Sequence, residues 1–188
     1  MYQTLLADSS LYTFLFQLDE DLAASCRQGG CSCNGSLHSA KYPRKPRGLP
    51  PGLEDKYDSR FSFCCAREGC RRRSTPASFR FLGRKVFVAA VVVLVSALRH
   101  GATPKRVALL RELVGASPRT VERWREWWQN GFVRSPFWKA VRGRLKTPVD
   151  RKTLPLSLLN AFSGQEERNG LIGLLRLLLP LSTPMQPF

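Results

Sequence analysis

Apolar residues near the start of the chain recur at spacings of three and four. They are Leu5, Leu6, Leu11, Phe14, Leu15, Leu18 and Leu22. Because these spacings place side chains on one face of a helix, they predict an amphipathic helix over residues 2–24. Ser9-Ser10 is the point at which this helix could break, and Gly29-Gly30 ends it.

After residue 40 the sequence pattern changes, first to a proline-rich segment and then to a short run in which polar and aromatic side chains alternate. Residues 41–52 hold four prolines and four basic residues, a proline density that excludes a helix, so an extended, cationic loop or arm is expected. Residues 60–64 alternate and are aromatic, which predicts a strand. Residues 31–73 therefore indicate a small β-rich unit with a basic insertion between its halves.

A strongly apolar run from Val86 to Leu98 follows. As a helix it would span only about 20 Å, well short of the roughly 30 Å core of a bilayer. A buried core helix over residues 84–99, stopped by Gly101, is the better interpretation. The β-branched residues also permit a strand, but the length and the alanine content favour a helix.

Two more helices are predicted, each with a capping residue followed by proline. Thr103 caps a helix over about residues 104–114, and Ser117 caps one over about residues 118–129, with a turn at 115–116. One apolar stripe crosses both helices, as a helix-turn-helix requires. Its members are Val107, Leu110, Leu113, Ala116, Val121, Trp124 and Trp128.

The remaining sequence predicts further helices. Residues 132–147 are aromatic and basic, and residues 154–162 and 166–179 form two apolar helices. The second of these either packs on the core, which is the favoured interpretation, or holds a partner helix. The tail over residues 180–188 contains three prolines and is expected to be flexible.

Positive charge is concentrated in the middle of the chain, whose formal net charge is +16. Residues 41–83 hold eleven Lys/Arg against four acidic residues, and residues 84–153 hold sixteen against four. Residues 1–40 have a net charge of −3, and residues 154–188 are neutral. This distribution indicates a localised surface for a polyanion, with a generally basic protein as the alternative.

Six cysteines indicate a metal site. Close pairs lie at Cys31-Ser-Cys33 and in the segment from Cys64 to Cys70. No signal peptide is visible, because residues 1–21 lack a basic segment and end in acidic residues. Clustered cysteines in such a chain more often bind metal than form disulfides, so one structural zinc ion is expected rather than disulfides or buried thiols.

The predicted zinc ligands are Cys31, Cys33, Cys65 and Cys70. Successive strand residues point to opposite faces, so Cys64 and Cys65 should not both reach one ion, and Gly69 allows a tight turn before Cys70. Cys64 could replace Cys65, His38 is the main rival ligand, and Cys26 is a weaker one. Four thiolates make a closed site without a position for water, so catalysis by this zinc is not expected.

The outer face of the 118–129 helix carries the predicted DNA-reading residues. Arginine can pair with guanine, and a hydroxyl can touch thymine or phosphate, with the helix N-terminus deepest in the major groove. The predicted base-reading residues are Ser117, Arg119, Thr120 and Arg123, and a solvated face is the alternative. Contacts to phosphates or a minor groove are expected from Arg71, Arg72, Arg73, Arg44, Lys45 and Arg47.

These elements predict a mainly α fold with a small β-rich zinc ribbon, a three-helix helix-turn-helix unit and C-terminal helices. The expected domains are an N-terminal helix at 1–25, the ribbon with its proline-rich insertion at 26–83, the helix-turn-helix at 84–131, and the basic segment and apolar helices at 132–188.

The order of zinc ribbon and helix-turn-helix, with Ser117-x-x-Thr120-Val-x-Arg123-Trp124, resembles the N-terminal DNA-binding region of insertion-sequence transposases and their small accessory proteins. Residues 42–48 and 60–73 are also similar to an uncharacterised bacterial protein family. The resemblance covers roughly residues 26–130. It implies recognition of mobile-element DNA ends or of a promoter, and it implies no chemistry.

No catalytic constellation stands out, so an enzyme is not expected. The acidic residues after the predicted helix-turn-helix, Asp150, Glu166 and Glu167, lie in too short a stretch for a three-carboxylate transposase. His38 and His100 lie far apart, and no glycine-rich phosphate loop occurs.

Three functions remain open. The first is a sequence-specific DNA-binding module in the cytoplasm, associated with the nucleoid, with no membrane partner. The second is an RNA-binding subunit of a ribonucleoprotein, in which bases stack on Trp127, Phe132, Phe137 and Trp138. The third is a protein-bridging scaffold, in which the C-terminal helices contact a transposase, a recombinase or another nucleoprotein subunit.

Overall fold

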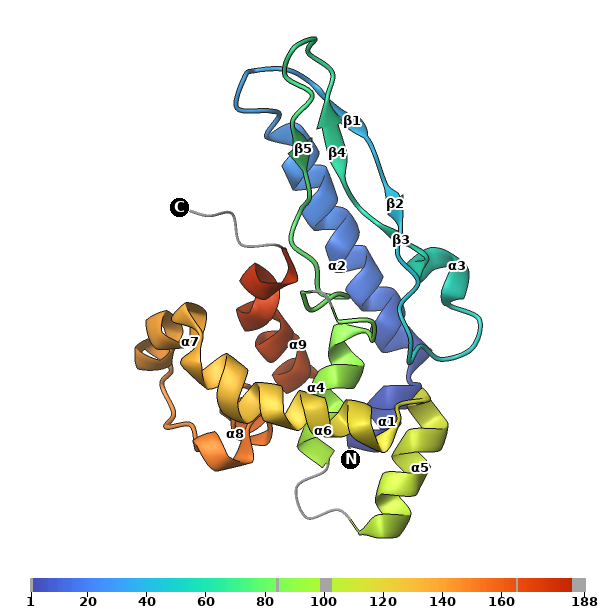
Figure 1. Ribbon diagram of the computed structural model, residues 1–188, viewed down its shortest axis with the longest axis vertical. Coiled ribbons are helices and arrows are strands. Elements are labelled where there is room, and N and C mark those ends of the chain that lie inside the picture. Colours follow the sequence, from blue (N-terminus) through green and yellow to red (C-terminus); the bar gives the residue numbers. More distant parts are fainter. Residues whose placement is uncertain (1, 84, 99–102, 165, 184–188) are drawn as a thin grey trace. The chain divides into compact units, whose positions relative to one another are not determined.

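The computed structural model describes residues 2–83, 85–98, 103–164 and 166–183. The fold is mainly helical with small antiparallel sheets, as the sequence predicts (Figure 1). The chain divides into two compact units. The helical unit contains Met1–Asp8 and Ala90–Leu177, and the ribbon unit contains Ser9–Ala89 and Leu178–Phe188. Within the described residues, every helix is too short or too polar to cross a membrane.

The ribbon unit combines one long helix with short strands. Helix α2 (Ser9–Gln28) lies along the strands, as Figure 1 shows. One antiparallel sheet has the order β1-β4-β5, and β2 pairs with β3. The remaining elements are β1 (Leu37–Ser39), β2 (Tyr42–Pro43), α3 (Glu54–Tyr57), β3 (Ser59–Arg60), β4 (Phe63–Cys65), β5 (Arg73–Ser74) and the 3₁₀ turn Leu179–Ser182.

The strand register brings the two cysteine turns together. Leu37, the first residue of β1, pairs with Cys65, the last residue of β4. The turn before β1 and the turn after β4 therefore lie at the same end of the sheet. The strand predicted over residues 60–64 is instead split between β3 and β4, because Arg60 pairs with Tyr42 whereas Phe63 pairs with Ser39.

The proline-rich segment is extended as predicted, but its backbone is tied to the ribbon unit. The Arg44 amide donates to the Asp58 carbonyl at 2.6 Å. The Arg47 amide donates to Val86 at 3.0 Å, and the Val88 amide donates back to Arg47 at 3.1 Å. Residues 86–88 are therefore extended, and the prediction of a helix from residue 84 is wrong for this part of the apolar run.

The helical unit contains the remaining helices, several of which match their predicted bounds. The predicted stop at Gly101 lies outside the described residues. The helices are α1 (Tyr2–Ala7), α4 (Ala89–Leu98), α5 (Pro104–Val114), α6 (Pro118–Glu126) with a π-helical extension at Trp127–Phe132, α7 (Pro136–Val141), α8 (Leu156–Ser163) and α9 (Glu167–Leu178). Short 3₁₀ turns lie at Arg142–Arg144 and Arg151–Thr153. The N-terminal helix breaks at Asp8, one residue before the predicted pair of serines.

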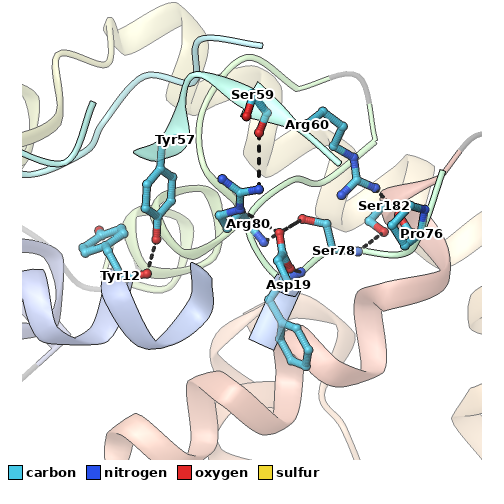
Figure 2. A network of polar contacts seen from close by, with 10 residues as sticks. Tyr12, Asp19, Tyr57, Ser59, Arg60, Pro76, Ser78, Arg80 and Ser182 are labelled. Carbon is cyan, nitrogen blue, oxygen red and sulfur yellow. Dashed lines mark hydrogen bonds and ion pairs between the residues drawn. The ribbon is translucent and has the colours of Figure 1, made fainter. Parts of the chain in front are cut away.

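A buried charge pair organises the core of the ribbon unit (Figure 2). The Asp19 carboxylate of α2 accepts from Arg80 Nε at 2.7 Å and from the Phe79 amide at 2.6 Å, and it also accepts from the Ser78 hydroxyl. The side chains of Asp19 and Arg80 are both 0% exposed. This pair therefore fixes α2 against the segment that leads to α4.

Candidate metal centre

The first cysteine turn follows directly after α2. Gly30 has a positive φ of 66°, which lets the chain turn sharply out of the helix. The Cys31 amide donates to Gly35 O at 3.1 Å, and the Asn34 amide donates to Cys31 O at 2.8 Å. Asn34 has a positive φ of 62°, a conformation that asparagine tolerates better than most residues. These bonds close a tight loop from which Cys31 and Cys33 project.

The second cysteine turn connects β4 to β5. The Cys65 amide donates to Arg72 O at 2.9 Å, and the Cys70 amide donates to Arg67 O at 3.1 Å. Gly69 has a φ of 79°, in agreement with the tight backbone predicted before Cys70. The Arg67 amide donates to Cys65 Sγ over 3.4 Å, a contact that favours the thiolate form of the sulfur.

The two turns bring the four predicted ligands together. Cys31 Sγ lies 3.7 Å from Cys70 Sγ, and Cys33 Sγ lies 3.5 Å from Cys65 Sγ. All four sulfur atoms lie within 4.8 Å of one another. Around a tetrahedral zinc with Zn–S bonds of about 2.3 Å, neighbouring sulfurs are roughly 3.8 Å apart. The cluster can thus hold one metal ion, and zinc fits a set of four thiols.

The rival ligands lie outside this cluster. Cys64 points away from it, and its Sγ contacts Arg71 O at 3.5 Å. His38 is exposed on β1 opposite Cys64. Cys26 packs against the apolar core that contains Cys31 and Cys65, and burial raises the pKa of its thiol. All six cysteines are free thiols, so the structure does not contain the alternative disulfide framework.

Hydrogen bonds and burial shift the pKa values of two thiols of the cluster in opposite directions. The Gly35 amide, followed by the thiols of Cys70 and Cys65, lowers the pKa of Cys33 to about 6. At Cys65 the Arg67 amide lowers the pKa, but burial and the neighbouring thiols outweigh it and raise the pKa to about 12. A bound cation would displace the protons of its thiol ligands.

Gly35 is a functional residue that the sequence interpretation missed. A Cβ at this position would lie 2.6 Å from Cys65 Sγ and 3.2 Å from Cys33 Sγ. Any side chain would therefore enter the space between the two cysteine turns. The signal in the sequence is a glycine two residues after the Cys-x-Cys pair.

The four-cysteine cluster packs against an apolar core of the ribbon unit. Cys31 and Cys65 are buried with Leu37 and Phe63 from the sheet, and Ala23 of α2 belongs to the same core. Phe61 and the partly buried Phe16, Cys26, Cys33 and Cys70 complete it. A metal in the cluster would consequently tie both turns to the end of α2.

The predicted basic residues of the ribbon unit differ in their exposure and in the contacts that their side chains make. Arg71, Arg72 and Arg73 are exposed, although Arg72 donates to the Ser32 hydroxyl and Arg73 donates to Ala40 O at 3.1 Å. Arg44 is only half-exposed, since it donates to the carbonyls of Gly83 at 2.5 Å and Lys85 at 3.3 Å. The exposed Lys45 pairs with Asp58 at 3.4 Å, and Arg47 is exposed.

The predicted base-reading residues lie at the start of α6. Ser117 caps this helix by accepting from the Thr120 amide at 3.2 Å, as the sequence predicts. Arg119 and Arg123 are exposed, and Arg123 contacts the Thr120 hydroxyl at 3.4 Å. Val121 and Trp124 of α6 are buried, together with Ala116 and Trp128. Leu113 is 47% exposed, so the prediction of one apolar stripe across both helices is wrong at the end of α5.

The aromatic residues proposed for base stacking are mostly part of the core. Phe132 is 1% exposed and Trp138 is 2% exposed, and their ring centroids are 5.1 Å apart. Trp127 and Phe137 are half-buried against Phe132, with centroids at 5.6 and 6.1 Å. Phe132 at the end of the π-helical turn and Trp138 of α7 are therefore not available for stacking, because both side chains are buried.

The chain matches no protein-family model, no curated protein and no solved structure.

Proposed function

We propose that this chain is a zinc-stabilised, non-catalytic DNA-binding protein in which α6 reads base edges. The supporting observation is the exposed basic face at the capped start of α6. Arg119 and Arg123 are four positions apart and project from one side of the helix, away from the buried Val121 and Trp124. This is the distribution that a recognition helix needs in a major groove.

The connection between α5 and α6 also supports a helix-turn-helix. Only residues 115–117 separate the two helices, and Gly115 has a positive φ of 65°. Val114 and Ala116 are buried at this turn, as the inner side of such a turn requires. The zinc would act structurally, since four protein thiolates leave no coordination position for a substrate.

Phosphate contacts would come from the ribbon unit. Its exposed arginines at 71–73 adjoin the metal centre, and such contacts raise affinity without reading sequence. The resemblance to insertion-sequence transposases points to mobile-element ends or a promoter as the target. An RNA-binding role keeps the same basic surface but loses two of its four stacking residues, so DNA is the favoured partner.

The test compares arginines on different sides of α6. Arg119→Ala and Arg123→Ala should each cost about 1–3 kcal/mol on the best duplex and reduce discrimination against scrambled DNA. Arg125→Ala is the matched control, because Arg125 lies on another side of the same helix and pairs with Glu122 at 3.7 Å. Arg72→Ala should instead weaken all duplexes and flatten the salt dependence by about one unit of slope.

The duplex would be selected from random DNA by the zinc-loaded protein and titrated at several salt concentrations. Equal losses for Arg119→Ala, Arg123→Ala and Arg125→Ala would show that α6 does not read bases. Structured RNA that outcompetes every duplex would instead establish the ribonucleoprotein role.

A further inference from the structure

The ribbon unit contains a cavity of about 440 Å³ with basic walls. The proline-rich segment supplies Arg44 and Lys45, and β3 supplies Arg60. The extended residues before α4 supply Lys85, and the hydroxyls of Ser182 and Thr183 lie at the same cavity. The volume is within the range of small-molecule sites.

Arg60 is the most unusual side chain of this cavity. It is 1% exposed, and its Nη2 donates to Pro76 O at 2.6 Å (Figure 2). Its Nε and Nη1 are buried and have no hydrogen-bond partner among the described residues. Burial lowers the pKa of Arg60 from its ordinary value. A buried cation with two unused donors is unfavourable unless an acceptor binds there.

The carboxylates near Arg60 are already engaged elsewhere. Asp19 binds Arg80 at 2.7 Å, and Asp58 pairs with Lys45 at 3.4 Å on the surface. Arg44 is held over the Phe81 ring with its guanidinium carbon 4.5 Å from the centroid, and Arg60 lies over the same ring at 5.4 Å. Arg80, the partner of Asp19, lies over this ring as well, at 5.0 Å, so three guanidinium groups lie close to one aromatic ring.

We propose that this cavity binds a phosphate monoester of nucleotide size, either as a free nucleotide or as the terminal phosphate of a nucleic-acid strand. Arginine N–H groups match phosphate oxygens, and Arg44 and Arg60 both belong to the cavity lining, which contains no acidic residue. Lys45 and Lys85 supply additional positive charge at the cavity. This site lies in the ribbon unit and does not depend on base reading by α6.

The experiment titrates zinc-loaded full-length protein with four small probes by calorimetry and thermal shift. Adenosine 5′-monophosphate should bind and raise Tm, inorganic phosphate should bind more weakly, and adenosine and sodium chloride of equal ionic strength should have no effect. A short single strand is then compared with and without its 5′-phosphate. Preference for the phosphorylated strand over the mononucleotide identifies a strand end as the ligand, and the reverse identifies a free nucleotide.

Three variants place the binding in the cavity. Arg60→Met should weaken nucleotide binding at least tenfold, yet its Tm without ligand should be no lower than that of the wild type, because an unpaired buried charge is removed. Lys85→Ala should weaken binding several-fold. Lys41→Ala is the control, because Lys41 is exposed over the Phe61 ring and does not line the cavity.

Each result of these titrations either supports or overturns nucleotide binding in the cavity. No binding at millimolar nucleotide would overturn the proposal, as would equal weakening by Lys85→Ala and Lys41→Ala. If Arg60→Met does not fold, Lys85→Ala and Lys45→Ala decide the question, since both residues lie at the cavity surface. Loss of nucleotide binding with intact duplex discrimination would confirm that the cavity and α6 act separately.

Discussion

Replacing Gly35 by alanine tests the geometry of the metal centre directly. The new Cβ would lie 2.6 Å from Cys65 Sγ, whereas ordinary contact begins at 3.4 Å, so the turns must separate by about 0.8 Å. Zinc–ligand distances tolerate only about 0.2 Å of deviation. We therefore expect Gly35→Ala to weaken zinc binding 10–100-fold, by analogy with mutations beside metal ligands. This loss equals about 1.4–2.7 kcal/mol.

The measurement is competition for zinc with a chromophoric chelator, together with Tm at saturating zinc. Gly143→Ala provides the matched control, because its Cβ would meet nothing within 4 Å. That control should keep wild-type zinc affinity. Wild-type affinity in Gly35→Ala would refute the reasoning, because the sulfurs could then not surround an ion in the arrangement described.

Two further substitutions test the metal centre and the buried charge pair of the ribbon unit. Cys70→Ser should abolish stoichiometric zinc and unfold the ribbon unit, whereas Cys64→Ser should retain one zinc per chain by elemental analysis, because Cys64 points away from the cluster. Wild-type protein that contains disulfides and no zinc would contradict this. Asp19→Asn should lower the free energy of unfolding in urea by about 3–5 kcal/mol, because it removes the carboxylate that neutralises the buried Arg80 guanidinium. A loss under about 1 kcal/mol, the value typical of exposed pairs, would show that the pair is solvated.

Features that depend on neighbouring residues could be predicted from the sequence. The cap at Ser117 and the bounds of α5 follow from local signals that survive in the fold. The ligand set also follows from a local rule, because alternation along β4 sends Cys64 and Cys65 to opposite sides. Cys64 is half-exposed and Cys65 is 0% exposed, as this alternation requires.

Features that depend on distant segments could not be predicted. The extended backbone at residues 86–88 exists because Arg47 supplies hydrogen-bond partners, so tertiary pairing overrides the helical preference of the apolar run. The charge pair joins two residues that lie 61 positions apart, Asp19 and Arg80, and no spacing in the sequence links them. The crowding at Gly35 likewise arises only when the second turn is folded against the first.

The discontinuity of the ribbon unit sets an order of events during synthesis. Its segment from Leu178 onward is separated from Ala89 by residues 90–177, and Ser182 Oγ accepts from the Ser78 amide at 2.9 Å. At about 5–20 residues per second, a ribosome makes the intervening chain in roughly 4–18 s. All four cysteines of the candidate metal centre precede Ala89. A nascent chain can therefore capture its metal several seconds before Ser78 gains this partner, so the two cysteine turns can form on an unfinished ribbon unit.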